Sequence, residues 1–233
     1  MSLFSDSLKK WFYHNDSNAA KAGTRICLLD ASGDPAGSDE LLRSLSFAQC
    51  PDDYVDMGLP SGTLWAKKNL GAVSETDYGM YVSWGNLEMH PYGDGYNFSQ
   101  NNYDISPAAS ISTDLTLEQD VAHSILGCGW RMTTKADLDE LVAGCNTSWT
   151  TDYEGSGIAG RVFTSKTNGN TLFFPASGCR DGNNMNNRGT AGYYWETGLN
   201  STTHAKHMYI GSGGVDTNGN RQRNCGCSIR PVL

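Results

Sequence analysis

The chain has 233 residues, enough to bury a sizeable core in one domain with a small appended segment. Its formal net charge of −8, without a cluster of Lys and Arg, argues against nucleic acid as a partner. No run approaches the roughly 20 apolar residues that span a bilayer, and the first residues lack the apolar core of a cleaved export signal, so no membrane insertion is expected.

The cysteine and glycine contents favour a loop-rich domain with reduced thiols. The 27 glycines and the charged fraction of 18% favour short strands and ordered loops over long helices. The seven cysteines are an odd number without the regular spacing of a disulfide scaffold, so most are expected to be reduced. We interpret Cys128 and Cys145 as small buried hydrophobic residues.

Residues 1–50 differ in texture from the rest of the chain. A short helix there would place its large apolar residues on one side: Leu3, Phe4, Leu8, Trp11 and Phe12. That face needs a partner, either the main domain or copies of the same chain, and the sequence leaves both open. We therefore expect residues 1–50 to be an attachment or oligomerisation segment, with a homotrimer as one assembly it could form. Residues 51–233 are expected to form the main domain.

The first part of the main domain is expected to consist of short strands and loops. Residues 54–66 hold two extended runs around a Pro-Ser-Gly turn, which is typical of a hairpin. Residues 78–85 form an aromatic-rich run that predicts another strand. Residues 88–112 are polar and rich in Asn, Tyr and Gly, so a long surface loop is expected there.

Two helices and a hairpin are expected in the middle of the chain. The periodicity of residues 117–126 predicts the first helix. The second begins after Thr134, where Asp137 completes a capping box, and it ends at Gly144. Residues 160–175 predict two strands joined by an Asn-Gly turn.

The tail of the chain has the composition of a binding surface. Residues 177–189 lack the periodicity of a helix or strand, and their Gly and Asn content suits ordered surface loops, where binding commonly occurs. In the strand-like run 207–212, Met208 and Ile210 share one face and are expected to pack inward. The opposite face is free to vary and carries His207, Tyr209 and Gly211. By the same alternation, Cys225 and Cys227 share one side of the last extended run.

A series of short motifs occurs in order along the main domain: Tyr54–Ala66, Tyr78-Gly79 with Trp84-Gly85, Gly129–Met132, Ser165–Asn170, Ser177–Arg180, Gly192–Trp195 and Ser228–Val232. In this series the chain resembles a family of Bacteroidetes and phage proteins, over roughly residues 54–233. That family has a C-type-lectin-like fold related to the formylglycine-generating enzymes. The resemblance implies an α+β, C-type-lectin-like domain with two helices, short antiparallel strands and extensive loops, preceded by a small N-terminal segment.

Several members of that family are variable proteins of diversity-generating retroelements, in which a reverse transcriptase rewrites the end of the gene at adenines. Asn codons are favoured targets, and Asn recurs in this tail. The resemblance thus implies a variable region at about residues 177–230. Together with the strand positions above, the expected ligand-binding set is Asp181, Asn183, Asn184, Asn186, Tyr193, His207, Tyr209, Gly211, Gly214, Asp216, Asn218, Asn220, Asn224, Cys225 and Cys227.

The expected function is hypervariable ligand binding without catalysis. Asn offers both a donor and an acceptor, Tyr adds rigid contact area and Gly leaves concavities, as in antibody paratopes. The resemblance implies an adhesin at a phage tail tip or a bacterial cell surface, with a host-surface protein or glycan as partner. No cofactor and no metal are expected. A zinc site at Cys225 and Cys227 would need His204 and His207, which lie three apart in an extended run and point to opposite faces.

Two other functions stay open at the level of sequence. One is a fixed-sequence bacterial surface adhesin of the same fold. The other is a formylglycine-type oxidase, because Cys227 precedes Arg230 as the second cysteine of such oxidases does. The position of the partner cysteine, however, is occupied by Gln222, so oxidase activity is disfavoured.

Overall fold

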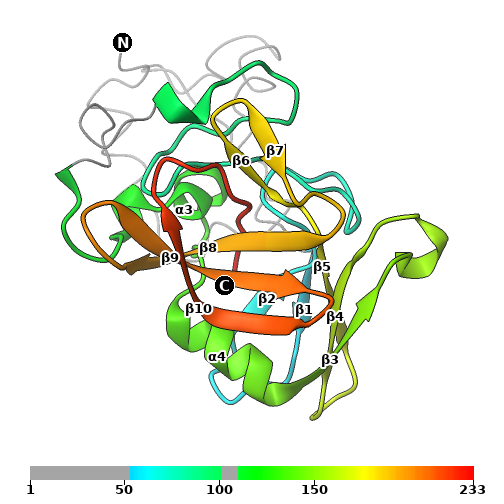
Figure 1. Cartoon of the computed structure of the whole chain (residues 1–233). Helices are drawn as coiled ribbons and strands as arrows, with labels where there is room; N and C mark the ends of the chain where they lie inside the picture. Colours follow the sequence, from blue (N-terminus) through cyan, green and yellow to red (C-terminus); the bar gives the residue numbers. More distant parts are fainter. Residues whose placement is uncertain (1–52, 101–109) are drawn as a thin grey trace, which may run out of the picture. The chain divides into compact units, whose positions relative to one another are not determined.

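The structure is a computed structural model that describes residues 53–100 and 110–233 (Figure 1). The predictions for residues 1–50, including a homotrimer, lie outside the described residues. In chain order the elements are β1 (Tyr54–Asp56), β2 (Leu64–Ala66), η1 (Phe98–Gln100), η3 (Leu117–Gln119), α3 (Val121–Leu126), α4 (Lys135–Gly144), β3 (Cys145–Thr150), η4 (Tyr153–Gly155), β4 (Gly160–Ser165), β5 (Thr171–Pro175), β6 (Cys179–Asp181), β7 (Asn184–Asn186), β8 (Ala191–Leu199), β9 (His204–Gly211) and β10 (Gly214–Gln222).

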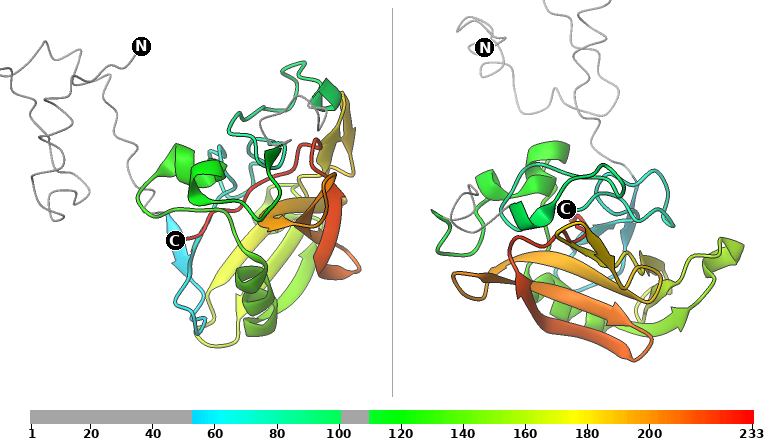
Figure 2. Two further views of the ribbon diagram at one scale, coloured as in Figure 1. Left: turned by 90° about the vertical axis from the view of Figure 1, so that its left-hand side faces the viewer. Right: turned by 45° about the horizontal axis from the view of Figure 1, so that its top comes forward.

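The strands of the described ranges form small antiparallel sheets. Two are two-stranded, β1-β2 and β6-β7, and two are three-stranded, β3-β4-β5 and β10-β9-β8. The C-terminal segment, red in Figure 2, runs from β10 back toward β1 and β2. Its last residues close against them, since Leu233 exchanges backbone hydrogen bonds with Leu64 and Val232 forms a bridge with Trp65. The two ends of residues 54–233 are therefore joined by main-chain hydrogen bonds.

The expected α+β, C-type-lectin-like class is wrong for this chain, because its regular structure is dominated by β-strands. The two α-helices have 6 and 10 residues, whereas β8 and β10 each have 9. Helical periodicity is confined to short stretches of the sequence. The longer Gly- and aromatic-rich runs form paired strands instead, which are stabilised by tertiary packing. Across the described ranges, no helix has the length and apolar character needed to cross a bilayer.

Helix α4 begins where its capping box predicts. The Thr134 hydroxyl accepts a hydrogen bond from the Asp137 amide, and the Asp137 carboxylate accepts one from the Thr134 amide at 2.7 Å. The same carboxylate lies 2.6 Å from the Arg131 guanidinium, which ties the preceding segment to the helix start. Leu138 and Leu141 are buried on its inner face. The predicted second helix is therefore confirmed, as is the core of the first one in α3.

Both predicted hairpins are confirmed. Strands β1 and β2 pair antiparallel with Val55 opposite Trp65, and β4 pairs with β5 in the same way. The turn between β4 and β5 also holds the two hairpins together, because the side-chain amides of Asn168 and Asn170 both donate to the Asp56 carbonyl, at 2.9 and 2.8 Å. Asn in this turn thus has a tertiary role that its turn propensity does not reveal.

The predicted strand at residues 78–85 is wrong in detail. This segment forms only isolated bridges, from Tyr81 to His90 and from Val82 to Cys227. Of its aromatic side chains, Tyr81 and Trp84 are buried, at 0% and 1% exposure, and Tyr78 is half-buried. The predicted loop at 88–112 is confirmed within its described residues, apart from the short turn η1.

The cysteine prediction needs one correction. Cys145 is buried, as expected, and the thiols of Cys145, Cys179, Cys225 and Cys227 are free. Cys128 instead lies on the exposed turn after α3 and is disulfide-bonded. Cysteine spacing alone could not separate these two situations.

The core consists of two clusters of buried side chains on opposite faces of the β8–β10 sheet. Tyr193 and Trp195 belong to one cluster, and Tyr194, between them in β8, belongs to the other. Arg230 is buried at 1% exposure and donates to the Asn69 side chain and to the carbonyls of Ala66, Lys67 and Phe173. Its guanidinium connects the C-terminal segment to two other parts of the fold.

Candidate ligand-binding face

One face of the β8–β10 sheet collects most of the strand positions that the sequence predicts for binding. In the register, Tyr193 lies opposite Tyr209, Trp195 opposite His207, and Asp216 opposite Tyr209. Directly paired residues project from the same side of a sheet. We call this side, which carries Tyr193, His207, Tyr209, Asp216 and Arg221, the Tyr193 face.

The opposite face of the same sheet packs inward, as predicted. Met208 and Ile210 are both fully buried, in one cluster with Tyr194. Val215, in register with Ile210, packs against the same cluster. The alternation of β9 therefore separates a core side from the Tyr193 face.

A register shift in β10 changes which residues reach the Tyr193 face. The ladder with β9 is interrupted between Asp216 and Gly219, after which Gly219 pairs with His207 and Arg221 with Ala205. Asn220 pairs with Lys206, which by alternation lies on the side of Met208. Asn220, which the resemblance includes in the binding set, therefore lies on the opposite side of the sheet from Asp216, because one bulge reverses the parity of the strand.

Aromatic rings form the centre of the face. The Tyr193 ring lies 5.4 Å from the Tyr209 ring and 5.5 Å from the His207 ring, measured between centroids. The Tyr193 hydroxyl accepts a hydrogen bond of 2.8 Å from the side-chain amide of Asn187, just after β7. The hairpin β6–β7 is thus fastened to the sheet at the middle of the face.

His207 is the least exposed polar residue at this centre, with 4% of its surface accessible. Burial lowers the pKa of its imidazole to about 4, and the charge of Arg221 acts in the same direction. Its Nδ1 atom has no hydrogen-bond partner within the described part of the chain. A β-carbon at Gly219 would lie 2.7 Å from the His207 Nε2 atom, so glycine leaves the space that the imidazole occupies. At neutral pH the imidazole is therefore uncharged.

Two predicted binding cysteines do not reach the surface. Cys225 and Cys227 are 2% and 0% exposed. The neighbouring pair Arg180 and Gly226 exchange backbone hydrogen bonds, so β6 lies alongside this part of the C-terminal segment and covers it. Burial raises the pKa of both thiols, which keeps them protonated and disfavours cysteine chemistry. Strand alternation indicated their common side but not what covers it.

The fifteen predicted binding residues thus divide by accessibility. Six are exposed: Asp181, Asn183, Asn184, Asp216, Asn218 and Asn220. Four are half-buried: Asn186, Tyr209, Gly214 and Asn224. Five are buried: Tyr193, His207, Gly211, Cys225 and Cys227. The buried members shape the face from beneath, and the others can contact a partner directly.

The hairpin β6–β7 is held at its base by a buried arginine. Arg180 is 4% exposed and donates to the Asp94 carboxylate at 2.9 Å and to the carbonyls of Pro91 and Tyr96. At the tip, Gly182 has a φ of 58°, a conformation that favours glycine in a two-residue turn. A fixed base thus presents the exposed tip residues, including Asn183.

Sequence reasoning missed Asn187 and Arg221. Arg221 lies on the Tyr193 face, with its guanidinium carbon 4.3 Å from the centroid of the Tyr193 ring. Its position on this face depends on the bulge in β10, and the spacing of residues in the sequence does not predict that bulge. The paired Asn residues before Arg188 were the available signal for Asn187, but only the tertiary structure shows the contact with Tyr193.

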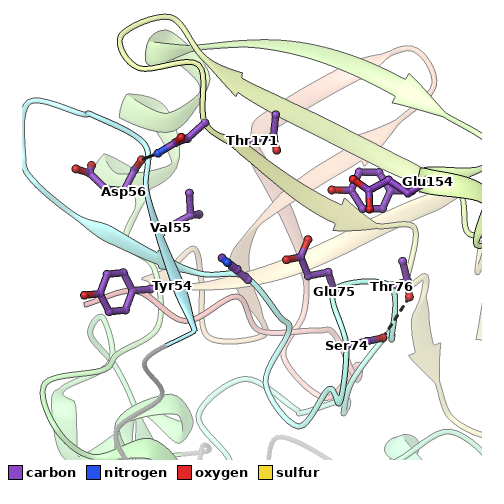
Figure 3. A pocket seen from close by; sticks show the side chains of 11 residues that line it. Tyr54, Val55, Asp56, Ser74, Glu75, Thr76, Glu154 and Thr171 are labelled. Carbon is purple, nitrogen blue, oxygen red and sulfur yellow. Dashed lines mark hydrogen bonds between the residues drawn. The ribbon is translucent and has the colours of Figure 1, made fainter. Parts of the chain in front are cut away.

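A separate hollow of about 660 Å³ lies between β1, the loop at 74–76, and η4 (Figure 3). Its lining includes the carboxylates of Asp56, Glu75 and Glu154, which come from these three parts of the fold. Burial raises the pKa of Tyr153 in its wall to about 12, with smaller contributions from the two glutamates. None of the predicted binding residues lines this hollow.

Within the described ranges, no three His, Cys, Asp or Glu side chains are grouped to hold a metal ion. A family model for a domain of unknown function, DUF8237, matches residues 149–232. That span is less than half of the chain and contains the whole Tyr193 face. Comparisons with curated proteins and with solved structures gave no match. The chain is therefore similar over this span to a domain family without an assigned activity.

Proposed function

We propose that the protein binds a macromolecular ligand through the Tyr193 face and the β6–β7 tip, and that a retroelement diversifies these positions. The ligand is a host-surface protein or glycan, and the protein acts as an adhesin at a phage tail tip or a bacterial surface. The proposal extends the sequence resemblance to variable proteins of diversity-generating retroelements. It assigns no catalytic step to the chain.

The proposal rests on one observation: the β8–β10 sheet has residues that fill the core on one side and exposed residues that can vary on its neighbouring strand. Met208 and Ile210 fill the core, while exposed Asp216 and Asn218 follow on the neighbouring strand. Replacement of exposed residues generally changes stability by less than about 0.5 kcal/mol, so such positions tolerate variation. Tyr, Asn and Gly at a rigid surface are also the residues that paratopes use.

The gene neighbourhood tests diversification directly. We expect a reverse-transcriptase gene near this one, together with a second, near-identical copy of the DNA that encodes about residues 177–230. The two copies should differ at adenines of the template copy, with the differing codons at exposed positions such as Asn183 and Asn218. A neighbourhood without these features would leave a fixed-sequence surface adhesin as the better explanation.

The binding surface is tested by a variant with four exposed substitutions: Asn183→Ala, Asn184→Ala, Asp216→Asn and Asn218→Ala. Asn at 216 keeps the side-chain oxygen that accepts the Asn218 amide hydrogen at 2.8 Å. We expect binding to a panel of Bacteroidetes cells, measured by flow cytometry, to fall at least about tenfold, because contacts at the centre of an interface dominate affinity. The melting temperature should stay within a few degrees of the wild type.

A matched control carries Asn146→Ala and Ser148→Ala, which are exposed positions on β3. This control should bind cells like the wild type. If the control loses binding and the four-residue variant does not, the ligand contacts another part of the molecule and the surface assignment is wrong.

A further inference from the structure

Arg221 is a cation on the Tyr193 face that has no oxygen acceptor among the residues 53–100 and 110–233. Its guanidinium carbon lies 4.3 Å from the Tyr193 ring centroid, its side chain is half-buried, and its Nε atom has no hydrogen-bond partner in the described part of the chain. Guanidinium carries five N–H donors. The polar side chain described in contact with it is the Cys225 thiol, which is a weak acceptor.

The other buried arginines of the described ranges are all bonded to oxygen atoms. Arg161 donates to Thr147 Oγ1 and to the Gly211 carbonyl, and Arg180 to the Asp94 carboxylate. Arg223 and Arg230 donate to main-chain carbonyls. The Arg161 Nε atom also lacks a partner in the described part of the chain, but that guanidinium has oxygen acceptors through its other nitrogen atoms. Arg221 differs from these four arginines because none of its donors is bonded to an oxygen atom of the described residues.

No carboxylate in the described ranges forms an ion pair with Arg221. Asp216 acts on the His207 imidazole through its charge, and Asp181 acts on the Cys225 thiol, yet neither lies within ion-pair distance of Arg221. The imidazole next to it is uncharged at neutral pH and has its own unpartnered Nδ1 atom. The centre of the face therefore carries the positive charge of Arg221 beside a neutral imidazole, and the Asp216 carboxylate on the same face forms no ion pair with it.

Holding a guanidinium away from bulk water without a partner costs free energy, and proteins usually pair such charges. Stacking on Tyr193 fixes the plane of the guanidinium, so less conformational entropy is lost when an anion binds. We propose that Arg221 is the specificity-determining residue of the Tyr193 face and receives a carboxylate, the acidic side chain of a protein partner. This inference rests on the proposed function, since it names the chemistry of the ligand for the same face.

A protein partner is favoured over an acidic glycan by the rest of the face. Tyr209 and the amides of Asn183, Asn184 and Asn218 offer planar contact area and paired donor and acceptor groups, which suit peptide surfaces. A carboxylate accepts two parallel N–H bonds from one guanidinium, and such charge-assisted pairs are about twice as strong as neutral hydrogen bonds. Asp or Glu on the partner therefore matches the donors that the protein leaves free.

The test is a titration of the full chain with a short peptide of alternating Glu and Gly, at constant ionic strength, followed by the arginine Nε–Hε signals in nitrogen-15 NMR. We expect one signal to shift saturably and to be absent in Arg221→Gln, which assigns it. The variant should bind the peptide at least about tenfold more weakly. The affinity of Arg221→Lys for the peptide should lie between those of the wild type and Arg221→Gln, because lysine keeps the charge but lacks the planar guanidinium.

Three controls make the titration decisive. A peptide of alternating Gln and Gly should produce no saturable shift. Lys206→Gln removes the same charge one ladder position away, on the opposite face of the sheet, and should bind like the wild type. Thermal unfolding verifies that Arg221→Gln is folded, and Arg221→Lys replaces it in the comparison if it is not.

The outcomes separate this inference from the proposed function. Equal peptide binding by the wild type and Arg221→Gln, or a shift with oligogalacturonate and not with the Glu peptide, would overturn the assignment of a protein carboxylate. The four-residue variant could still lose cell binding, and the proposed function would then stand without it. If the peptide result is positive but the four-residue variant binds cells normally, the anion site exists and the proposed adhesin surface is wrong.

Discussion

At the scale of single residues, His207 shows how strand position and burial combine at the candidate site. The imidazole lies on the predicted face of β9, but it is only 4% exposed, with the Tyr193 and Trp195 rings and Gly219 beside it. Burial, helped by the charge of Arg221, lowers its pKa to about 4 from the ordinary 6.5. It shapes the face and holds Tyr193 in place, so contact with a ligand falls to its more exposed neighbours.

This pKa predicts a pH dependence of stability. Between pH 6.5 and about 4 the unfolded chain binds a proton at His207 that the folded chain does not, so the contribution of His207 to the free energy of unfolding falls as the pH is lowered through this window. The loss should be about 3 kcal/mol. Chemical denaturation at a series of pH values should show that the wild type loses stability relative to His207→Gln as the pH is lowered through this window. Glu196, whose pKa burial raises to about 7, acts in the opposite direction in both proteins and cancels in the comparison. Equal slopes would mean that His207 is accessible to protons in the fold.

At the scale of elements, the bulge in β10 decides which side chains form the site. It brings Gly219 and Arg221 onto the Tyr193 face and moves Asn220 to the other one. Strand alternation was sufficient for β9, where Met208 and Ile210 pack inward as predicted. It could not have sorted the residues of β10, because an extra residue reverses the parity of the strand at a point that Asn- and Gly-rich sequence does not reveal.

The bulge predicts a steric requirement at Gly219. A β-carbon there would lie 2.7 Å from His207 Nε2 and 3.0 Å from the His207 carbonyl oxygen, so Gly219→Ala must displace the imidazole or the strand. We expect a loss of about 1–3 kcal/mol in the free energy of unfolding. Gly213→Ala, in the open turn between β9 and β10, is the matched control and should cost less than about 1 kcal/mol. Equal effects of the two substitutions would show that the space beside His207 is not restricted.

At the scale of the whole molecule, Arg230 fastens the C-terminal segment to residues distant in sequence. Its donors bond the Asn69 side chain and main-chain carbonyls at the end of β2, just after it and within β5. The segment also passes beside β8, where Ser228 and Trp195 share a main-chain hydrogen bond. The Tyr193 face is therefore built on a framework that is closed by the end of the chain.

Removal of that guanidinium should affect the entire fold. Arg230→Met leaves several buried acceptors unsatisfied, and we expect a loss of about 3–5 kcal/mol, a large fraction of the stability of an ordinary domain. Thermal unfolding followed by circular dichroism should show a much lower melting temperature. Arg188→Met removes an arginine that is exposed and stacked on Tyr78 and Tyr92, and should change the melting temperature little. If Arg230→Met and the wild type had similar melting temperatures, the hydrogen bonds of Arg230 would not be needed to stabilise the fold.

The sequence by itself determined the local elements that are specified by patterns of a few neighbouring residues. The capping box at Thr134 and Asp137, the hairpins at 54–66 and 160–175, and the alternation of Met208 and Ile210 all depend on neighbouring residues. Only the tertiary structure decided the β-dominated class, the covering of Cys225 and Cys227, and the entry of Arg221 into the face. These features depend on pairing between distant strands and on one bulge, and the free energies that select them come from contacts between residues far apart in the chain.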